Sequence, residues 1–340
     1  MEPPTVLITG ASGVVGRAIV EQLDQERLIG LVHEDGAPLE VEERHVSDLA
    51  SPRLGLEPEA WAELAERTDA IVHSAALTEW GRPVGEYDAI NVEGTRQVAE
   101  LARLANAPVY YVGTAFSHAI ARGRADRLAA DNVVRPYVTS KLQAERVLEE
   151  SGVPHSVFRP TNLVGDSRTG AGWRPQIVQT LSDWICRGKA PYLPAHEGNL
   201  IDVVPLDTLS VAVAAAVRQR DLGRRYWVTC GSRAPTVEAV VDLLVAHAGE
   251  RGREIEPPPV VDPARGLPSP LAEVPPTSRA FLKVLIDVSE VTRECGGTLP
   301  TSLEDLHGRL GVPEFDPLDA YRRSLDYWAR ERDGVGGGVG

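Results

Sequence analysis

Hydrophobic and polar positions alternate along the first half of the chain in a way that predicts strands and helices in turn. Short apolar runs rich in β-branched residues are followed by longer stretches with apolar positions three and four apart. The predicted strands span residues 5–10, 28–33, 43–49, 70–76, 109–114 and 155–160. The predicted helices between them span residues 14–25, 58–67, 84–106 and 137–152. This alternation predicts an α/β fold with a doubly wound parallel Rossmann sheet.

The second half of the chain is less regular, and its pattern is mostly helical. Helices are predicted over residues 175–188, 207–220 and 236–250, with one strand over residues 224–230. A proline-rich segment, 256–276, leads into an amphipathic stretch, 278–295. These two segments together, 256–295, are a candidate lid over a substrate pocket, with an oligomer contact or simple surface packing as the alternatives.

The same pattern divides the chain into two expected regions. Residues 1–165, with parts of 190–232, are expected to form the nucleotide-binding Rossmann domain. Residues 166–190 and 233–333 are expected to form a smaller, mostly helical substrate-binding region. The glycine-rich tail, 334–340, is expected to be disordered.

A glycine-rich loop follows the first predicted strand. In "TGASGVVG" three glycines are spaced as GxxGxxG between a strand and a helix. The first permits a tight turn, the second lets a pyrophosphate approach the backbone, and the third allows close packing of helix on strand. The loop predicts dinucleotide binding at the helix N-terminus, with an ordinary strand-to-helix turn as the alternative. The residues expected to contact the nucleotide here are Gly10, Ser12, Gly13, Val14, Val15 and Gly16.

The end of the second strand bears on the choice between the two nicotinamide cofactors. An acidic residue there binds the ribose hydroxyls of NAD, and an arginine accepts the 2′-phosphate of NADP. His33 occupies this place and is neither, while Arg17 either reaches a 2′-phosphate or is a solvated helix residue. Glu34 and Asp35 would repel a phosphate if they pointed inward. NADPH is the expected cofactor, with NADH as the alternative. Asp48 is placed either to accept from the adenine amino group or to cap a helix.

Composition narrows the classes of partner and compartment. The 340 residues are 43% hydrophobic and carry a formal net charge of −14. That charge argues against nucleic acid or an anionic membrane surface as a partner, since both require a basic face. No apolar run approaches the roughly 20 residues needed to span a bilayer, and no signal peptide is visible, so a cytoplasmic protein is expected. The three cysteines are isolated and the eight histidines lack ligand spacing, which predicts reduced thiols and no metal site.

Several motifs taken together resemble those of the extended short-chain dehydrogenase/reductases. They are "TGASGVVG", "SDL", "HSAA", "NVEGT", "VGTAF", "YVTSK" and "RPTNLVGDS", and the resemblance covers roughly residues 5–230. Within that superfamily, "VGTAF", "PYVTSK" and "VGDSRTG" look most like the branch of thioester reductase domains, carboxylic acid reductases and fatty acyl-CoA reductases. The resemblance implies a Ser/Thr–Tyr–Lys catalytic set, which matches Thr114, Tyr137 and Lys141 here.

The resemblance also implies further contacts to the cofactor. Ala75 is expected beside the adenine and its ribose, and Lys141 on the nicotinamide ribose. Asn91, in "NVEGT", is expected to brace the central helix or a buried water. The other matched cofactor positions are Leu49, Ala76, Pro160, Thr161 and Asn162.

The chemistry of a carbonyl reduction explains the three catalytic residue types. Tyr137 and Lys141 are four residues apart, so they share one face of a helix. A phenol has a pKa of about 10, and a nearby ammonium lowers it toward the range that suits proton transfer. A compact ammonium also suits ribose binding better than a planar guanidinium. Thr114, at the end of a strand, can donate a hydrogen bond to the substrate oxygen.

Substrate contacts are expected from loops at the carboxyl ends of the strands. The candidates are Trp80, His118, Arg168 and Trp173, and core or wall packing is the alternative for the aromatic residues and the histidine. The expected function is NADPH-dependent reduction of a ketone or aldehyde on a largely apolar small metabolite of polyketide type, by a monomer or homodimer.

Three other functions stay open at this point. A free-standing thioester reductase would act on an acyl-CoA or on an acyl carrier protein, which would then be a partner. A non-enzymatic NAD(P)-binding sensor is disfavoured by the Tyr–Lys pair. A dehydratase usually carries an acidic residue beside the threonine, and Ala115 stands there instead.

Overall fold

The computed structural model describes residues 2–34 and 38–336, and its largest element is a seven-stranded sheet. Every pair of neighbouring strands is parallel. In sheet order the strands are β10 (Arg225–Val228), β6 (His155–Pro160), β5 (Val109–Val112), β4 (Ala70–His73), β1 (Thr5–Thr9), β2 (Arg27–Val32) and β3 (Glu43–Val46). The predicted doubly wound Rossmann sheet is confirmed. Because the strand order reverses between β1 and β4, a ligand is expected to bind at the carboxyl ends of these two strands.

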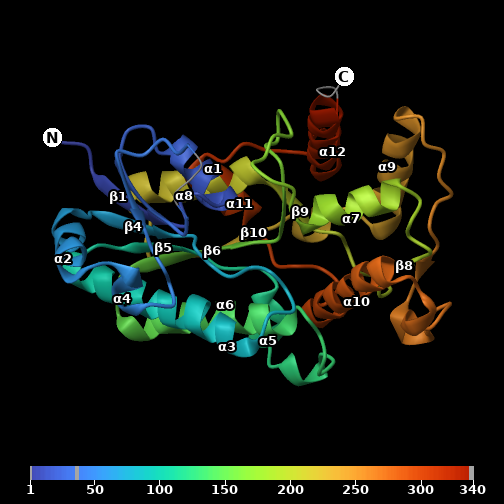
Figure 1. Cartoon of the computed structure of the whole chain (residues 1–340), viewed down its shortest axis with the longest axis horizontal. Helices are drawn as coiled ribbons and strands as arrows, with labels where there is room; N and C mark the ends of the chain where they lie inside the picture. The colour runs from blue at the N-terminus through green and yellow to red at the C-terminus, as the bar shows by residue number, and fades with distance from the viewer. Residues whose placement is uncertain (1, 35–37, 337–340) are drawn as a thin grey trace.

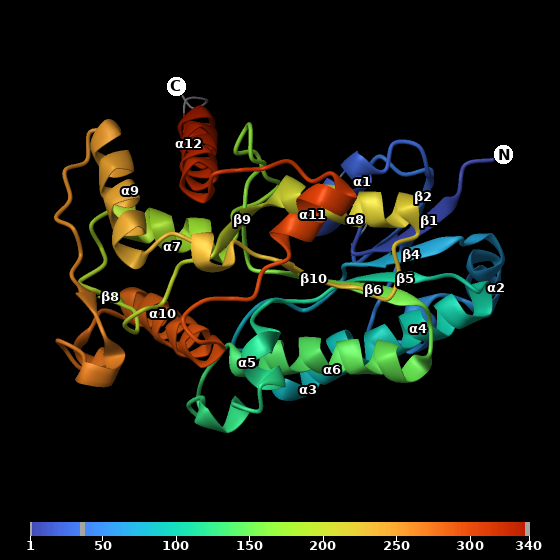
Figure 2. The ribbon, with the colours of Figure 1, turned by 180° about the vertical axis from the view of Figure 1, so that it is seen from behind.

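Helices cover both faces of the sheet (Figures 1 and 2). One face carries α1 (Val14–Gln22), α8 (Leu206–Gln219) and α11 (Leu303–Leu310). The other face carries α2 (Pro58–Arg67), α4 (Gly94–Ala105) and α6 (Arg135–Ser151). The apolar stripe of each helix therefore has a buried sheet surface to pack on, as the alternation of elements predicts.

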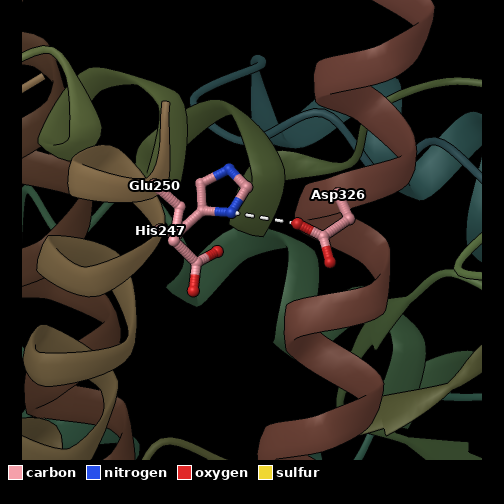
Figure 3. A group of neighbouring side chains, drawn as sticks. All are labelled: His247, Glu250 and Asp326. Atoms are coloured by element: carbon pink, nitrogen blue, oxygen red, sulfur yellow. Dashed lines mark ion pairs between the residues drawn. The ribbon is translucent and has the colours of Figure 1, made fainter. Parts of the chain in front are cut away.

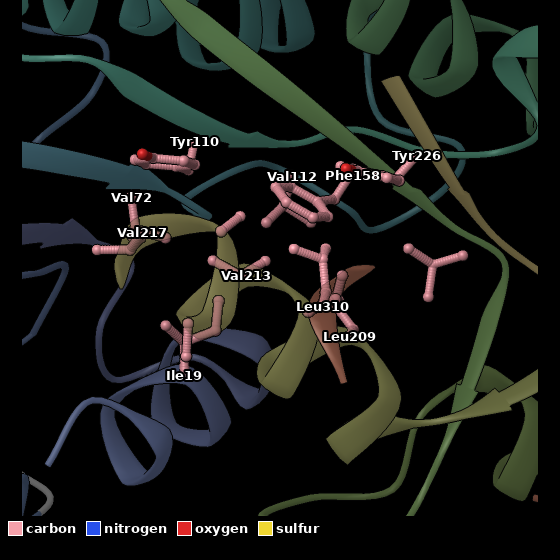
Figure 4. Packing of buried hydrophobic residues seen from close by; sticks show 14 of the residues in the cluster. Ile19, Val72, Tyr110, Val112, Phe158, Leu209, Val213, Val217, Tyr226 and Leu310 are labelled. Atoms are coloured by element: carbon pink, nitrogen blue, oxygen red, sulfur yellow. The ribbon is translucent and has the colours of Figure 1, made fainter. Parts of the chain in front are cut away.

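The core on the first face joins segments that are far apart in the sequence. Figure 4 shows Ile19 of α1, Leu209 of α8 and Leu310 of α11 beneath Tyr110 and Phe158 of the sheet, and all five are buried. The sequence pattern does not predict α11, and its residues were expected in the substrate-binding region. The structure differs because the apolar face of α11 completes the core of the sheet.

The remaining helices enclose a second hydrophobic core beside the sheet. They are α7 (Ile177–Cys186), α9 (Val237–Glu250), α10 (Pro276–Cys295) and α12 (Pro317–Gly336). Two short parallel pairs accompany them, β7 (Asn162–Val164) with β9 (Val203–Pro205) and β8 (Leu193–Pro194) with β11 (Val260–Val261). The shorter helical turns are α5 (Ser117–Ala121), η1 (Pro52–Gly55), η3 (Ala125–Arg127), η4 (Gly231–Arg233), η5 (Pro263–Arg265) and η6 (Leu271–Glu273).

Some predicted boundaries were wrong where the local geometry changes. The helix predicted over 84–106 is divided into α3 (Val84–Tyr87), a π-helix (Asp88–Glu93) and α4. Residues 334–336, predicted to be disordered, continue α12, while 337–340 lie outside the described residues. Within the described residues, no helix has both the length and the apolar character needed to cross a membrane.

Candidate active site

The glycine-rich loop follows β1 at its carboxyl end and lies against the segment that follows β4. Gly10 has a φ of +68°, which side chains rarely allow, and a Cβ there would lie 2.7 Å from the Cα of Ala75. Gly13 is the N-cap of α1 and supplies no side-chain cap. A Cβ on Gly16 would lie 2.1 Å from the carbonyl oxygen of Gly10, so only glycine lets α1 start this close to the loop. The uncapped amides at the N-terminus of α1 fit the phosphates of a dinucleotide.

Arg17 is buried rather than solvated, with 4% of its surface exposed. Its Nε donates to the carbonyl oxygen of Ser12 at 3.0 Å, and an Nη donates to the carbonyl oxygen of Pro38. Its guanidinium carbon lies 3.9 Å from the centre of the Trp173 ring. Burial lowers the pKa of Arg17, and repulsion from Arg44 adds to this. Arg17 thus ties the glycine loop to the segment after β2, and its contact with a 2′-phosphate stays a prediction.

The other residues expected on the adenine side lie near the ends of β2 and β3. His33 is exposed, and Asp35 lies outside the described residues. The Asp48 carboxylate accepts from the Ser51 hydroxyl at 2.7 Å and from the Ala50 amide at 3.0 Å. These hydrogen bonds lower the pKa of Asp48, the one from Ser51 most. Asp48 therefore stabilises the turn over Ala50 and Ser51, and its contact with adenine stays a prediction.

Asn91 joins the loop that follows β4 to α6, whereas the sequence predicted that it braces the central helix or a buried water. Its Oδ1 accepts from the Leu77 amide at 2.7 Å, and its Nδ2 donates to the Ser140 hydroxyl at 2.9 Å. In the same loop, the Ala75 amide donates to the Thr9 hydroxyl at 3.2 Å. The π-helix turns Asn91 toward α6, and π-turns of this kind often occur at functional sites. Ala76 is partly buried in this loop, and Leu49 is also partly buried, against Gly94.

Thr114 and Tyr137 form the polar pair of the candidate active site. Thr114 follows β5 and is buried, while Tyr137 lies in the first turn of α6 and is half-buried. A hydrogen bond from Thr114 lowers the pKa of the Tyr137 phenol, but burial outweighs it and raises that pKa to about 12. The ring of Tyr87 lies 6.4 Å away. The phenol is therefore protonated at neutral pH and can serve as a proton donor.

Lys141 follows Tyr137 by one helical turn, but its ammonium points at the sheet. Its Nζ donates to the carbonyl oxygen of Val112 at 2.7 Å and lies 4.4 Å from the centre of the Tyr111 ring. Burial lowers the pKa of Lys141 to about 7, against the opposing charge of Glu145. Burial and neighbouring hydroxyls set the pKa of Tyr137. The expected lowering of that pKa by the lysine is thus not seen, because the ammonium is turned to a backbone carbonyl.

A buried ion pair behind Lys141 was missed by sequence reasoning. The Nε of Arg159 donates to both carboxylate oxygens of Glu145 at 3.1 Å, and its guanidinium lies 4.4 Å from the centre of the Trp227 ring. A Cβ on Gly113, the residue after β5, would lie 2.7 Å from Oε1 of Glu145, so a side chain there would push this carboxylate away from its position. The spacing of Lys141 and Glu145, one turn apart, could have indicated the acid.

His73 is a second buried polar residue that the sequence did not single out. Its Nδ1 lies 2.7 Å from the Thr9 hydroxyl, and its Nε2 lies 3.0 Å from the Thr95 hydroxyl. Because Thr95 donates its own proton to the carbonyl oxygen of Asn91 at 2.6 Å, Nε2 must donate and Nδ1 must accept. Burial, with repulsion from Lys141, lowers the pKa of His73 to about 3. The neutral ring thus links β1, β4 and α4.

The segment after β6 is fixed beside Thr114. The amide of Ala115 donates to the carbonyl oxygen of Pro160 at 2.8 Å. Thr161 and Asn162 both donate to the carbonyl oxygen of Asp202, at 3.1 and 2.9 Å. The Asp202 carboxylate accepts from two backbone amides after β10, and burial raises its pKa to about 6. The predicted nicotinamide-side residues therefore lie next to Thr114, the predicted catalytic threonine.

Two of the predicted substrate residues lie on the catalytic side. Trp80 packs in the apolar cluster that also contains Tyr137. His118 meets the ring of Trp227 edge to face, with 5.3 Å between the ring centres. Burial, followed by repulsion from Arg122, lowers the pKa of His118. Both side chains can therefore form part of a substrate wall near the phenol.

The other two predicted substrate residues lie elsewhere. Arg168 and Trp173 line a cavity of about 570 Å³ between α1, α8 and α12. The residues that line this cavity do not include Thr114, Tyr137 or Lys141. The structure therefore does not bring Arg168 and Trp173 together with the catalytic set.

The candidate lid is held against the loop that precedes α6. On α10, Asp287 accepts from the Val133 amide at 2.9 Å, and Glu290 accepts from Asn132 at 2.7 Å. Val288 of the same helix lines a cavity of about 30 Å³. Packing of this kind suits a wall of the site, and opening of the segment as a lid stays a prediction.

Known proteins with similar sequences are much longer than this chain. Fusarin C synthetase of Gibberella moniliformis is 25% identical over 268 residues, which cover 72% of this chain and 7% of that protein. A linear gramicidin synthase of Brevibacillus parabrevis is 30% identical over 181 residues, which cover 49% of this chain and 4% of that protein. Isonitrile lipopeptide synthase of Streptomyces coeruleorubidus is 32% identical over 202 residues, which cover 49% of this chain and 14% of that protein.

Solved structures of similar fold cover nearly the whole chain. The terminal R domain of the myxalamid PKS-NRPS pathway has a TM-score of 0.74 and 23% identity, with 97% of this chain and 92% of that chain covered. The reductase domain of a nonribosomal peptide synthetase from Mycobacterium tuberculosis has a TM-score of 0.66 and 21% identity, with 96% of this chain and 92% of that chain covered.

A family model settles the relationship. The NAD-binding model described as male sterility protein matches residues 39–213, just over half of the chain. The expected place among the extended short-chain dehydrogenase/reductases is confirmed, as is the expected class of nicotinamide cofactor. The chain belongs to the NAD-binding male sterility protein family and is an NAD(P)H-dependent oxidoreductase of that superfamily.

Proposed function

We propose that this chain is a thioester reductase, which uses NAD(P)H to reduce an acyl group held as a thioester on a carrier protein or on coenzyme A. The observation that carries the reductive chemistry is the hydrogen-bonded pair of Thr114 and Tyr137 at the carboxyl edge of the sheet. The glycine loop opens onto the same edge, since β1, β4 and β5 are parallel neighbours. The similarity in fold to reductase domains of peptide and polyketide synthetases supports a thioester as the substrate.

The residues at this edge suit the protonation that the reaction needs. When bound, the nicotinamide supplies a hydride to the thioester carbon. Negative charge then builds on the carbonyl oxygen, where the hydroxyls of Thr114 and Tyr137 can donate hydrogen bonds. The phenol, with its pKa raised to about 12, holds its proton until that oxygen becomes basic enough to take it. The resulting hemithioacetal loses the thiol by breakage of its C–S bond and leaves an aldehyde.

Reduction of a free ketone or aldehyde is the second candidate. The apolar cluster around Tyr137, which includes Trp80, favours a hydrophobic carbonyl compound of either kind. The same pair of hydroxyls would protonate a ketone oxygen in the same way. The two candidates differ in one product, because only a thioester releases a thiol.

The experiment follows NADPH oxidation and thiol release together. The purified chain is given NADPH with a medium-chain acyl-CoA, and in parallel with a ketone of similar length. We expect acyl-CoA to release one thiol for each hydride consumed, or one for every two if the aldehyde is reduced further to the alcohol. NADPH oxidation with the ketone alone would replace the thioester proposal with carbonyl reduction.

A matched pair of variants tests the roles of the hydroxyls. Tyr137→Phe should lower turnover by about 10²–10⁴-fold, the usual contribution of a positioned proton donor, while NADPH binding stays intact. Tyr87→Phe is the control, because its ring lies 6.4 Å from that of Tyr137 and its hydroxyl donates to the carbonyl oxygen of Glu79. Equal losses in both variants would mean that packing, not proton donation, underlies the effect.

A further inference from the structure

Three side chains from two helices converge on one point of the second core. His247 and Glu250 lie one turn apart on α9, and Asp326 faces them from α12 (Figure 3). One ligand atom from each residue lies within 4.8 Å of the others. His247 is 5% exposed, whereas Glu250 is at the surface. The set therefore has a buried nitrogen at its base and carboxylates toward solvent.

The buried nitrogen of His247 lacks a hydrogen bond. Its Nδ1 is shielded from solvent and has no hydrogen-bond partner among the described residues, although Oδ1 of Asp326 is 3.3 Å away. His196 shows what a bonded pair looks like in this chain, since its Nδ1 lies 2.8 Å from Oδ1 of Asp262. Buried polar atoms are nearly always hydrogen-bonded, so an Nδ1 that is held only by a 3.3 Å ion pair with Asp326 has room for a stronger partner.

The spacing matches two ligands of one metal ion. Zinc binds imidazole nitrogen and carboxylate oxygen at about 2.0–2.2 Å with tetrahedral angles, which places two such ligands about 3.3 Å apart. The two oxygens of Asp326 are also divided between partners. Oδ1 faces His247, while Oδ2 lies 3.5 Å from Arg322 on the same helix. The arginine therefore leaves the inner oxygen for an ion and orients the carboxylate.

We propose that His247, Glu250 and Asp326 bind a zinc ion. The three protein ligands are Nδ1 of His247 and one oxygen from each carboxylate, and water takes the fourth position. The exposed Glu250 side chain closes the site by a rotation about its own bonds. Imidazole with carboxylates is a donor set that suits zinc, and the two carboxylates balance the charge of the ion.

The ion would clamp α12 to α9 and thereby hold a loop of the substrate side. Ser324, two residues before Asp326, is fully buried and accepts from the Gly165 amide at 3.1 Å and from Gln179 at 3.1 Å. Gly165 directly follows β7, which begins at Asn162. A clamp at Asp326 therefore fixes the turn of α12 that anchors this loop.

The test measures zinc binding directly and does not depend on activity. The metal-free chain is titrated with zinc chloride in the presence of a competing chromophoric chelator, and bound zinc is counted by mass spectrometry after desalting. We expect one zinc per chain. Glu250→Gln and Asp326→Asn keep the size of each side chain and should weaken zinc binding at least tenfold. Asp262→Asn, at the bonded His196 pair, should bind zinc as the parent does.

Thermal unfolding gives a second readout. Zinc should raise the melting temperature of the parent and of Asp262→Asn, because an ion that binds only the folded state stabilises it. It should leave the melting temperature of Asp326→Asn unchanged. The proposal is overturned if the parent binds no zinc at micromolar concentrations, or if Glu250→Gln and Asp326→Asn bind it as tightly as the parent.

Discussion

The guanidinium of Arg17 lies against the face of Trp173, with 3.9 Å between its central carbon and the centre of the ring. Arg17 belongs to the helix that follows the glycine loop, and Trp173 belongs to the loop between β7 and α7. The contact therefore joins the predicted cofactor side of the chain to a segment expected to bind substrate. Trp173 remains 52% exposed despite this contact.

A double-mutant cycle should measure this contact. Trp173→Leu, Arg17→Met and the double variant are compared by urea unfolding. We expect a coupling free energy of about 0.5–2 kcal/mol, because the ring is exposed but the guanidinium is buried. Arg17→Met should cost more than Trp173→Leu, because it also loses hydrogen bonds to the carbonyl oxygens of Ser12 and Pro38. Strict additivity of the two single variants would show that the contact contributes nothing.

The buried Lys141 should make stability depend on pH. Its pKa is about 7 in the folded chain and 10.5 ordinarily, so between these values the unfolded chain holds a proton that the folded chain has lost. Stability from this group therefore rises with pH from about 7 upward, and below pH 7 the cost of burying the charge is greatest. Lys141→Met should remove that rise in the free energy of unfolding. The exposed Lys189→Met is the control, and equal slopes in the two variants would refute the depressed pKa.

The ion pair of Glu145 and Arg159 should be costly to break. Glu145→Gln leaves the buried arginine without its charge partner and should lower the free energy of unfolding by about 3–5 kcal/mol. Glu86→Gln breaks the exposed pair with Arg82 and should cost less than about 1 kcal/mol. Both are measured by chemical denaturation at neutral pH. A loss below about 1 kcal/mol for Glu145→Gln would mean that water or another group relieves Arg159.

A side chain at Gly113 should destabilise the fold, because it would meet the same ion pair. A Cβ there would meet Oε1 of Glu145 at 2.7 Å, so Gly113→Ala should destabilise by about 1–3 kcal/mol through overpacking. Gly85→Ala, in α3, meets nothing within 4 Å and should be neutral or stabilising by up to about 1 kcal/mol. If the two variants have the same free energy of unfolding, the Glu145–Arg159 pair can shift to make room for a side chain.

Local pattern in the sequence determined the architecture of the first half and pointed to Thr114, Tyr137 and Lys141 as the candidate catalytic set. The spacing of apolar positions distinguishes a helix, which buries one stripe, from a central strand, which buries both faces. Strands and helices could therefore be placed without knowing which segments they pack against. The glycine spacing and the one-turn separation of Tyr137 from Lys141 are also local features. Their placement at one edge of the sheet followed from the parallel order of the strands.

Only the tertiary structure decided which distant segments meet. Arg17 contacts Trp173, Glu145 pairs with Arg159, and α11 packs on the sheet beside α8. Each of these contacts joins two segments whose separation in the sequence does not predict that they meet. The direction of Lys141 was decided in the same way, since a carbonyl oxygen on a neighbouring strand competes with Tyr137 for its ammonium. Periodicity records the burial of a side chain, but the partner it is buried against depends on how the whole chain packs.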